Sequence, residues 1–272
     1  MRSRSRYIPP VNAPALDTAA TESLLAFWRD AGVDACFEDA PVDRTHVAPP
    51  PAVKAVAKAT ASVVALPATG DAAAEARRLA AGADTLEALG EAIAGFTGCP
   101  LRDMGAKQSV FSRGNPQAPI LIIGEGPGAE EDERGQPFVG KAGQLLDRML
   151  AEAGLTDRVF ITNTVFWRPP GNRTPSPAEQ AVCAPFLERA FFLLKPKLVL
   201  LLGAAAAKSV LSTEDGIMKM RGHWKEWRLA EGNVSAPALP TFHPAFLLRT
   251  PMAKKAAWAD MLALAARLDA AE

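Results

Sequence analysis

The sequence predicts an α/β fold, a three-layer α/β/α sandwich around a central four-stranded parallel sheet. Short apolar runs have the length and the continuous hydrophobicity of strands that are buried on both faces. These runs lie at 119–124, 158–162 and 197–202. Helix-like segments follow them, at 141–153, 177–194 and 204–211. Strands that alternate with helices form parallel βαβ units, in which helices cover both faces of the sheet.

The C-terminal part of the chain is expected to complete the sheet. Extended segments at 223–229 and 237–242 predict an edge hairpin, and its second strand leads directly into His243. This second strand is the fourth strand of the predicted parallel sheet. A last helix over 251–269 carries apolar residues at helical spacing, so we expect it to pack on the sheet.

The N-terminal third of the chain differs from the rest in composition. Its segments are an amphipathic helix at 17–31, a linker rich in Pro and Ala at 41–70, and a helix at 71–95. We therefore predict two parts. Residues 1–95 form an N-terminal extension, and residues 96–272 form the domain that carries the candidate site.

Composition limits the class of protein. The 272 residues are 49% hydrophobic and carry a formal net charge of zero, so no global positive field attracts a polyanionic partner. Three scattered cysteines argue against a disulfide scaffold and favour a reducing cytoplasm. The basic N-terminus has no apolar segment behind it, and no stretch reaches the ~18 apolar residues of a membrane span. We expect a cytoplasmic protein without a secretory signal or a membrane anchor.

Polar side chains follow the predicted strands at the points where the strands end. Glu125 comes after the first strand, Asn163 after the second and His243 after the last. The carboxyl ends of parallel strands meet at one edge of a sheet, where ligands bind in α/β proteins. Phe138 lies in a Pro-Phe-Val-Gly turn further along the chain. We expect these four side chains to share a pocket, and Gly126 allows the backbone to approach a ligand closely.

Each of these residues also has an ordinary structural interpretation. Glu125 can cap a helix or face solvent, and Asn163 can form a turn. His243 can be a hydrogen-bonded structural residue, and Phe138 can belong to the core. A nucleotide-binding, Rossmann-like module is a further alternative for the whole sheet. Its phosphate loop requires the pattern G-x-G-x-x-G, which the loop after the first strand does not carry in full.

The chain contains four motifs in a fixed order: GEGPGAEEDERGQPFVG, TNTVFWRPPGNRTPSPAE, LGAAAA and TFHPAFLLR. In this combination they resemble the uracil-DNA glycosylase superfamily, in particular its family-4 type. The resemblance covers roughly residues 96–270. It implies an enzyme that flips uracil out of DNA and hydrolyses its N-glycosidic bond. Free uracil and an abasic site would be the products, as in base excision repair.

The resemblance implies a role for each side chain at the strand ends. Glu125 would orient or activate the attacking water, and His243 would donate a hydrogen bond to uracil O2 as the base departs. Phe138 would stack on the flipped base. The Asn163 amide would bind uracil N3 and O4, and its polarity would reject cytosine.

Other residues would contact the substrate around this centre. Backbone N–H groups near Gly126 would assist, and Glu131 would wall the C5 side of the base and help to exclude thymine. Phe246 and Leu247 would act as apolar wedges for the space that the flipped base leaves, although both can instead belong to the core. The basic residues that would face DNA phosphates are Arg168, Arg173 and Arg249.

One feature departs from the pattern of the family. Family-4 members hold an iron–sulfur cluster on four cysteines, and only Cys99 and Cys183 remain at those positions. Phe96 and Trp167 stand at the other two, and Cys36 lies outside the region of resemblance. Such clusters need about four ligands, so we expect neither an iron–sulfur cluster nor another metal. The two large aromatic side chains are expected to fill the space with an apolar plug.

The sequence therefore predicts a monomeric uracil-DNA glycosylase that acts without a cofactor. Its partner would be uracil-containing DNA, single- or double-stranded, in the bacterial cytoplasm at the nucleoid. The alternative is a protein that binds uracil or abasic DNA with little or no turnover. The departure at the cluster positions leaves this alternative open, whereas intact Glu125, Asn163 and His243 favour the enzyme.

Overall fold

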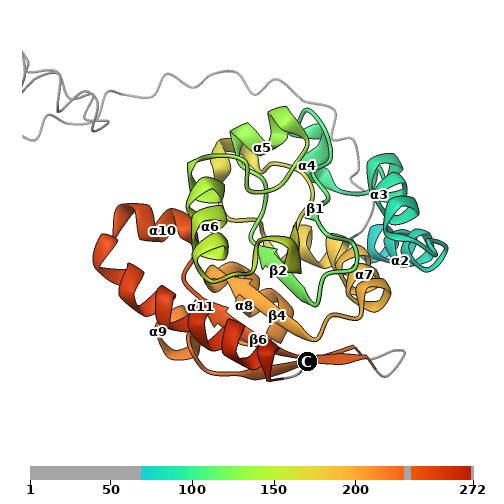
Figure 1. The fold of residues 1–272 in the computed structure, drawn as a ribbon. Coiled ribbons are helices and arrows are strands. Elements are labelled where there is room, and N and C mark those ends of the chain that lie inside the picture. Colours follow the sequence, from blue (N-terminus) through green and yellow to red (C-terminus); the bar gives the residue numbers. More distant parts are fainter. Residues whose placement is uncertain (1–68, 230–233, 271–272) are drawn as a thin grey trace, which may run out of the picture. The chain divides into compact units, whose positions relative to one another are not determined.

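A six-stranded sheet organises the part of the chain that the structure describes. The computed structural model describes residues 69–229 and 234–270 (Figure 1). The strands are β1 (Arg113–Gly114), β2 (Ile120–Gly124), β3 (Val159–Asn163), β4 (Leu198–Leu202), β5 (Lys225–Arg228) and β6 (Ser235–Thr241). They lie side by side in the order β1-β3-β2-β4-β6-β5.

The four central strands run parallel, and the two edge strands run antiparallel to their neighbours. β3, β2, β4 and β6 form the parallel centre, in which Gly124 of β2 is paired with Asn163 of β3. β1 pairs with β3 at one edge, and β5 pairs with β6 at the other. The predicted four-stranded parallel sheet thus describes only the centre, because the whole sheet is mixed. No sequence pattern marks β1, since a strand of two residues is defined by its partner.

Helices connect the strands. The longer ones are α2 (Thr69–Ala81), α3 (Leu86–Gly95), α6 (Lys141–Glu152), α7 (Pro177–Leu194), α8 (Gly203–Leu211) and α11 (Lys254–Asp269). The shorter ones are α4 (Pro100–Asp103), α5 (Ala129–Arg134), α9 (Ile217–Met220) and α10 (Pro244–Arg249), with 3₁₀ turns η1 (Thr156–Arg158), η2 (Pro170–Asn172) and η3 (Pro251–Ala253). Within the described residues, none of these helices has the length and apolar character needed to cross a lipid bilayer.

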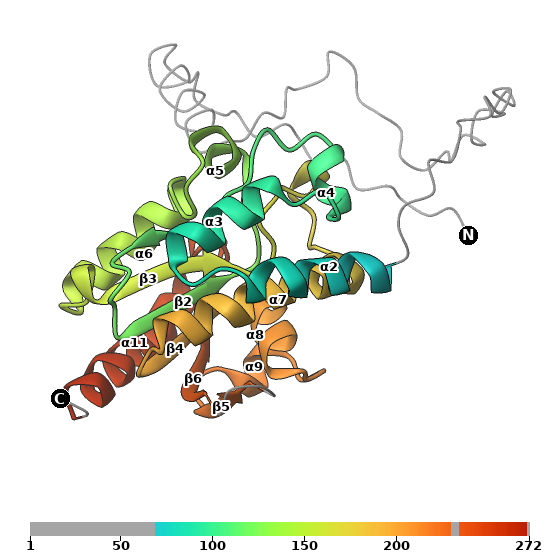
Figure 2. The ribbon, with the colours of Figure 1, turned by 90° about the vertical axis from the view of Figure 1, so that its right-hand side faces the viewer.

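Alternation along the strands divides the core into two layers. Leu121 and Ile123 of β2 pack on one face of the sheet, together with buried residues of α2, α3, α7 and α8. Ile120 and Ile122 pack on the opposite face, together with buried residues of α6 and α11. Successive side chains of a strand point to opposite faces, so a continuously apolar strand needs cover on both. Figures 1 and 2 show the resulting helix–sheet–helix layers.

The predicted helix over 71–95 is two helices in the structure. α2 ends at Ala81 and α3 begins at Leu86. Thr85 caps α3, because its hydroxyl oxygen accepts a hydrogen bond from the Ala88 N–H at 3.1 Å. A capping residue of this kind starts a new helix, although the apolar spacing along the sequence continues through the break and predicted a single helix.

The predicted boundary at residue 96 falls inside a compact unit. α2 lies along α7 in Figure 2 and buries Ala76 and Ala80. Both α2 and α3 belong to the same compact unit as the sheet. The helices that we assigned to the extension are therefore part of the layered domain. The predicted helix over 17–31 lies outside the described residues, as does the linker over 41–70 apart from its last two positions.

Candidate active site

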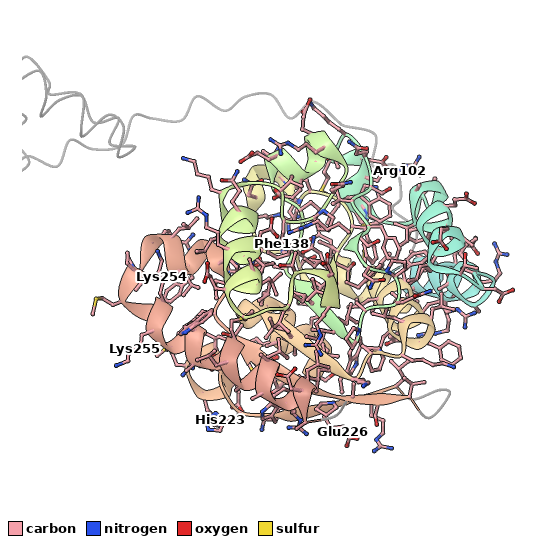
Figure 3. All side chains as sticks on the ribbon, viewed as in Figure 1. Arg102, Phe138, His223, Glu226, Lys254 and Lys255 are labelled. Atoms are coloured by element: carbon pink, nitrogen blue, oxygen red, sulfur yellow. The ribbon has the colours of Figure 1, made fainter. Side chains whose placement is uncertain are left out.

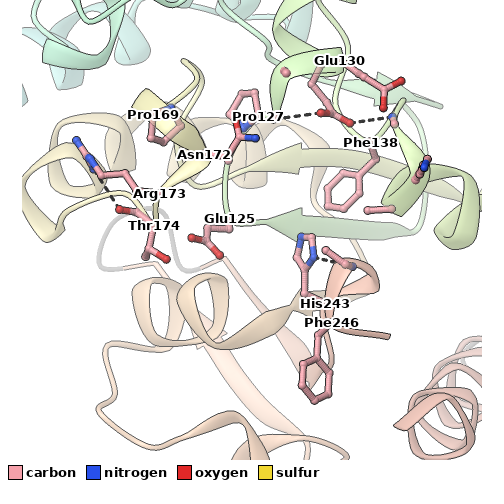
Figure 4. A pocket seen from close by; sticks show the side chains of 18 of the residues that line it. Glu125, Pro127, Glu130, Phe138, Pro169, Asn172, Arg173, Thr174, His243 and Phe246 are labelled. Carbon is pink, nitrogen blue, oxygen red and sulfur yellow. Dashed lines mark hydrogen bonds between the residues drawn. The ribbon is translucent and has the colours of Figure 1, made fainter. Parts of the chain in front are cut away.

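A pocket of about 590 Å³ opens where the parallel strands end. Glu125, Phe138 and His243 line this pocket together, as Figure 4 shows. Five other residues that the sequence singled out also line it: Gly126, Glu131, Arg173, Phe246 and Arg249. The lining does not include Asn163, Arg168 or Leu247. The arrangement brings a carboxylate, an aromatic ring and an imidazole to one cavity.

Glu125 is held at the pocket by bonds between two strand ends. Its backbone carbonyl accepts a hydrogen bond from the Thr164 hydroxyl at 2.6 Å, and the Thr164 N–H donates to the Gly124 carbonyl at 3.0 Å. These bonds tie the loop after β2 to the loop after β3. In the described part of the chain, no protein group donates a hydrogen bond to the Glu125 carboxylate. Both of its oxygens are therefore available to a water molecule or a substrate.

Asn163 is a buried amide that finds no hydrogen-bond partner in the described part of the chain. It is 1% exposed, and among the described residues neither Oδ1 nor Nδ2 forms a hydrogen bond. Leaving such a group unpaired costs about 1–3 kcal/mol. A Cβ on the adjacent Gly124 would lie 2.5 Å from Asn163 Oδ1 and 2.5 Å from the Phe138 ring, so the amide and the ring flank one point. The unpaired amide indicates a ligand that presents both a donor and an acceptor.

Phe138 presents its ring to the pocket from a strained turn. Its φ is 56°, a left-handed conformation that is rare for a bulky residue. The centroid of its ring lies 5.6 Å from that of His243, with an angle of 32° between the two planes. Gly143 leaves room for the turn, because a Cβ there would overlap the Phe138 carbonyl oxygen. Strain of this kind points to a functional constraint on the ring.

His243 is positioned as a neutral hydrogen-bond donor. It caps the start of α10, and its Nδ1 accepts a hydrogen bond from the Ala245 N–H at 3.1 Å. Burial lowers the pKa of His243 to about 4; the positive charge of Arg249 adds to this effect and the Glu131 carboxylate opposes it. The imidazole is therefore neutral at neutral pH, and its proton is on Nε2. Nε2–H can donate to an oxygen that gains negative charge.

Glu131 uses both carboxylate oxygens to join two pocket loops. Oε2 accepts a hydrogen bond from the Gly128 N–H at 3.1 Å, at the start of α5. Oε1 accepts hydrogen bonds from the Val139 and Gly140 N–H groups at 3.0 and 2.9 Å. The carboxylate thus fixes the turn that carries Phe138. Its predicted contact with the C5 side of a base remains a prediction.

The region that forms the sheet matches a known protein family. Residues 111–262, more than half of the chain, match the uracil DNA glycosylase superfamily. This chain belongs to the uracil DNA glycosylase superfamily. The match includes all six strands and the three residues at the strand ends, Glu125, Asn163 and His243.

Known members of the superfamily are similar to this chain over most of their length. The Type-4 uracil-DNA glycosylase of Thermotoga maritima is 39% identical over 168 residues, which are 61% of this chain and 84% of that protein. The Type-4 enzyme of Pyrobaculum aerophilum is 39% identical over 171 residues, 61% of this chain and 86% of that protein. The Type-4 enzyme of Sulfurisphaera tokodaii is 38% identical over 178 residues, 63% of this chain and 80% of that protein.

Two of the arginines that were predicted to contact DNA phosphates form hydrogen bonds within the protein, at the rim of the pocket. Arg173 donates two hydrogen bonds to the Glu179 carboxylate, at 2.6 and 2.9 Å, and holds the pKa of Glu179 below its ordinary value. Arg168 donates to Asn172 Oδ1 at 2.7 Å. Both guanidinium groups stabilise the loop between β3 and α7. Arg249 lines the pocket and forms no ion pair with any described residue.

The side chain of Leu247 belongs to the core. It is fully buried in a cluster with Phe242 and Ala257, because α10 turns it toward the interior. Phe246 packs against the same cluster, with its ring centroid 5.0 Å from that of Phe242. The burial of Leu247 contradicts its predicted role as a wedge and agrees with the core alternative. Two exposed apolar side chains of this region are Leu248, at 44%, and Met252, at 90%.

The positions at which the resemblance implies cluster ligands are tightly packed. Cys99 and Cys183 are fully buried, and their sulfur atoms lie 3.9 Å apart. The buried rings of Phe96 and Trp167 lie with centroids 6.3 Å apart, and Phe96 packs edge-on against Phe186 at 5.2 Å. Across residues 69–229 and 234–270, no group of three or more His, Cys, Asp or Glu is placed to hold a metal ion. Two thiols and two aromatic rings do not fit the donor set of a four-cysteine cluster.

The two buried cysteines interact with each other. The Cys183 thiol donates a hydrogen bond to the Cys99 sulfur. This hydrogen bond, together with burial, raises the pKa of Cys183 well above its ordinary value. Cys36, the third cysteine of the chain, lies outside the described residues.

Sequence reasoning missed several residues that shape the pocket. Lys141 lines it shortly after the turn of Phe138. Its position at the start of a predicted helix, just after that turn, could have indicated that it lies near the pocket. Gly124 and Gly143 provide space that only the packed structure reveals. Arg113 donates a hydrogen bond to the Phe138 carbonyl from 25 residues away, which no local pattern records.

Proposed function

We propose that this protein is a uracil-DNA glycosylase that hydrolyses the N-glycosidic bond of deoxyuridine in DNA. The reaction releases uracil and leaves an abasic site. One observation carries the proposal: the unpaired, buried amide of Asn163 lies beside the Phe138 ring, next to the pocket that Glu125 and His243 line. Similarity to Type-4 uracil-DNA glycosylases supports the same substrate.

Asn163 distinguishes uracil from cytosine by the direction of its hydrogen bonds. Uracil presents a donor at N3 and an acceptor at O4, which match the Oδ1 acceptor and the Nδ2 donor of the amide. Cytosine presents an acceptor at N3 and a donor at N4. In the same pocket, cytosine therefore leaves buried polar groups unpaired, and this penalty rejects it. Phe138 provides a stacking surface, which by itself accepts any base.

Glu125 acts on the water molecule that attacks the sugar. Its carboxylate holds the water by accepting a hydrogen bond, directs the oxygen at C1′ and takes a proton as the new C–O bond forms. The C1′–N1 bond breaks, and its electron pair moves onto the base. The negative charge of Glu125 also stabilises the positive charge that develops on the sugar.

His243 stabilises the departing base. Its Nε2–H donates to uracil O2 as negative charge develops there. The Ala245 N–H occupies Nδ1, so the proton stays on the nitrogen that faces the substrate. The Phe138 ring lies 5.6 Å from the imidazole, which keeps the stacking surface and the donor together.

Replacing Asn163 by aspartate is expected to weaken discrimination against cytosine. The variant loses the donor for uracil O4 and gains an acceptor for the cytosine amino group. We expect the ratio of kcat/KM for uracil over cytosine to fall by about 10-fold or more. The measurement compares oligonucleotides that differ only in carrying one uracil or one cytosine.

Asn115→Asp is the matched control for this change. Asn115 lies on the loop before β2, where its amide donates to the Asp157 carbonyl at 3.1 Å. The control alters the same chemical group outside the pocket, so it is expected to keep the wild-type ratio. An unchanged ratio in Asn163→Asp would remove Asn163 from base recognition.

The proposed steps use side chains of a single chain and need no metal. We infer that the protein acts as a monomer on uracil-containing DNA in the cytoplasm, without an iron–sulfur cluster. The packing of Phe96 against Trp167, at two of the four ligand positions, supports the absence of the cluster. The aromatic pair takes over the packing role, since each ring buries a large apolar surface.

Protein purified without oxygen is expected to contain no stoichiometric iron and to lack the visible absorbance of an iron–sulfur cluster. Metal analysis and an absorbance spectrum of the folded protein measure both properties. The positive control is the double variant Phe96→Cys, Trp167→Cys, which returns thiols to both positions and is expected to take up iron. Stoichiometric iron in the wild-type protein would show that the aromatic pair does not replace the cluster.

Basic and apolar side chains in and after α10 offer a surface for DNA. Arg249 lines the pocket, and Lys254 and Lys255 lie at the edge of the molecule in Figure 3. None of the three forms an ion pair with a described residue, so all can face phosphates. Leu248 and Met252 are their exposed neighbours in sequence. These two side chains, rather than Leu247, are available to fill the space that a flipped base leaves.

A further inference from the structure

Charged side chains hold the turn of Phe138 from two sides. Glu131 accepts hydrogen bonds from the two N–H groups that follow Phe138. From the other side, Arg113 donates Nε–H to the Pro137 carbonyl at 2.8 Å and Nη2–H to the Phe138 carbonyl at 3.2 Å. The peptide groups before and after the aromatic residue are therefore both fixed by side chains.

Arg113 is itself anchored to two elements. It lies on β1, where it pairs with Ile161 of β3, and its Nη2 donates to Asp147 Oδ1 on α6 at 2.6 Å. Its side chain is 23% exposed. A guanidinium presents several N–H groups in fixed directions, which the single ammonium of a lysine does not. One planar group thus links the edge of the sheet, the turn and α6.

Phe138 needs this support because its backbone conformation is unfavourable. A positive φ brings Cβ close to the following carbonyl, and it persists only where surrounding contacts hold it. The conformation sets the place of the ring, against Gly124 and beside the imidazole of His243. If φ relaxed to a negative value, the ring would leave this place.

We propose that Arg113 is a positioning residue of the base pocket. It acts through Phe138, because its guanidinium holds the turn in the conformation that keeps the ring beside the Asn163 amide. This inference rests on the proposed function, since it gives Arg113 a part in binding the flipped uracil. Arg113 does not line the pocket. Its loss therefore weakens base binding more than it slows bond cleavage.

The variant Arg113→Gln tests the proposal under single-turnover conditions. A single-stranded oligonucleotide with one uracil gives the half-saturating enzyme concentration and the maximal cleavage rate constant. We expect the half-saturating concentration to rise about 10-fold, the size of a lost stacking contact, while the maximal rate changes much less. Arg113→Lys keeps the charge beside Asp147 but not the two carbonyl contacts, so it is expected to resemble Arg113→Gln.

Arg189→Gln is the matched control. Arg189 is 20% exposed, and it donates to the Ala83 carbonyl at 2.8 Å and to Asp84 at 3.4 Å. Like Arg113, it contacts a backbone carbonyl and an aspartate and is mostly buried, and it also lies over the Phe192 ring at 4.9 Å, but it does not line the pocket or touch the turn of Phe138. We expect wild-type kinetics from this variant. A melting curve of each variant identifies any loss of fold.

A double variant shows whether Arg113 acts through Phe138. In a Phe138→Ala background there is no ring to position, so adding Arg113→Gln is expected to cause no further loss. A full additional 10-fold rise in that background would overturn the proposal, and so would wild-type kinetics in Arg113→Gln alone. Failure of the proposed function gives a result that differs from failure of the Arg113 proposal alone. In that case the wild type and Arg189→Gln also release no uracil, and both proposals are wrong.

Discussion

Replacing Glu125 by glutamine is expected to lower the rate constant of uracil release by about 10²–10⁴-fold. Glutamine keeps the shape of the side chain, but it neither takes a proton nor carries the charge that stabilises the sugar. Glu131 cannot take over this role, because backbone N–H groups already occupy both of its oxygens. Single-turnover cleavage at saturating enzyme measures the effect, since it reports the chemical step.

Glu133→Gln is the control for this prediction. Glu133 lies on α5, is 63% exposed and pairs with Lys107 at the surface. Exposed ion pairs contribute little to stability, so this variant is expected to keep the wild-type rate. DNA affinity is expected to survive in Glu125→Gln, because the stacking ring and the amide remain. Cleavage at the wild-type rate in Glu125→Gln would remove Glu125 from the reaction.

Replacing His243 by alanine is expected to lower kcat by about 10²–10³-fold, the usual effect of losing one positioned donor. The structure supports an effect of this magnitude on kcat, because Nδ1 accepts a hydrogen bond from the Ala245 N–H and only Nε2–H can donate to the substrate. His223→Ala is the control. His223 is exposed and lies at the edge of the molecule in Figure 3, so its loss is expected to leave kcat unchanged. Equal effects of the two variants would exclude His243 as the donor.

The pH dependence identifies the form of His243 that donates. With a pKa of about 4 the imidazole stays neutral, so its contribution to kcat is expected to be constant as the pH rises through 6.5, its ordinary pKa. A rate that falls as the pH rises through 6.5 would instead indicate an imidazolium donor. The measurement is a profile of kcat against pH for the wild type and His243→Ala.

The same pKa shift affects stability with a definite sign. Between pH 6.5 and about 4, the unfolded chain binds a proton at His243 and the folded protein does not. The free energy of unfolding therefore falls as the pH drops through this window. His243→Ala removes this contribution, so its stability is expected to depend less on pH. Denaturant unfolding at several pH values measures the difference.

The strands and the polar residues at their ends could be predicted because both depend on local sequence. Ile120–Gly124 is a continuous apolar run, and its burial on both faces follows from that composition. Glu125 and His243 could be placed together because the ends of parallel strands meet at one edge of a sheet. The sequence therefore predicted which side chains meet at the candidate site, but not how they are arranged there.

Other features depend on contacts that no local pattern records. Leu247 and Leu248 are identical neighbours, yet one is fully buried and the other is 44% exposed, because the packing of α10 decides their direction. The left-handed turn of Phe138 depends on hydrogen bonds that Arg113 donates and Glu131 accepts, and these two residues lie on separate elements. The two-residue strand β1 likewise exists only through its partner.

Turnover of uracil in DNA is the central claim. The most direct measurement is a multiple-turnover assay in which a labelled single-stranded oligonucleotide with one uracil exceeds the enzyme. Alkali then breaks the strand at abasic sites, and a gel separates the products. We predict that the wild type converts most of the substrate, so that each enzyme molecule releases several uracils, while matched thymine and cytosine oligonucleotides stay intact. Binding of the uracil oligonucleotide without strand breakage would contradict the account and would indicate a uracil-binding protein without turnover.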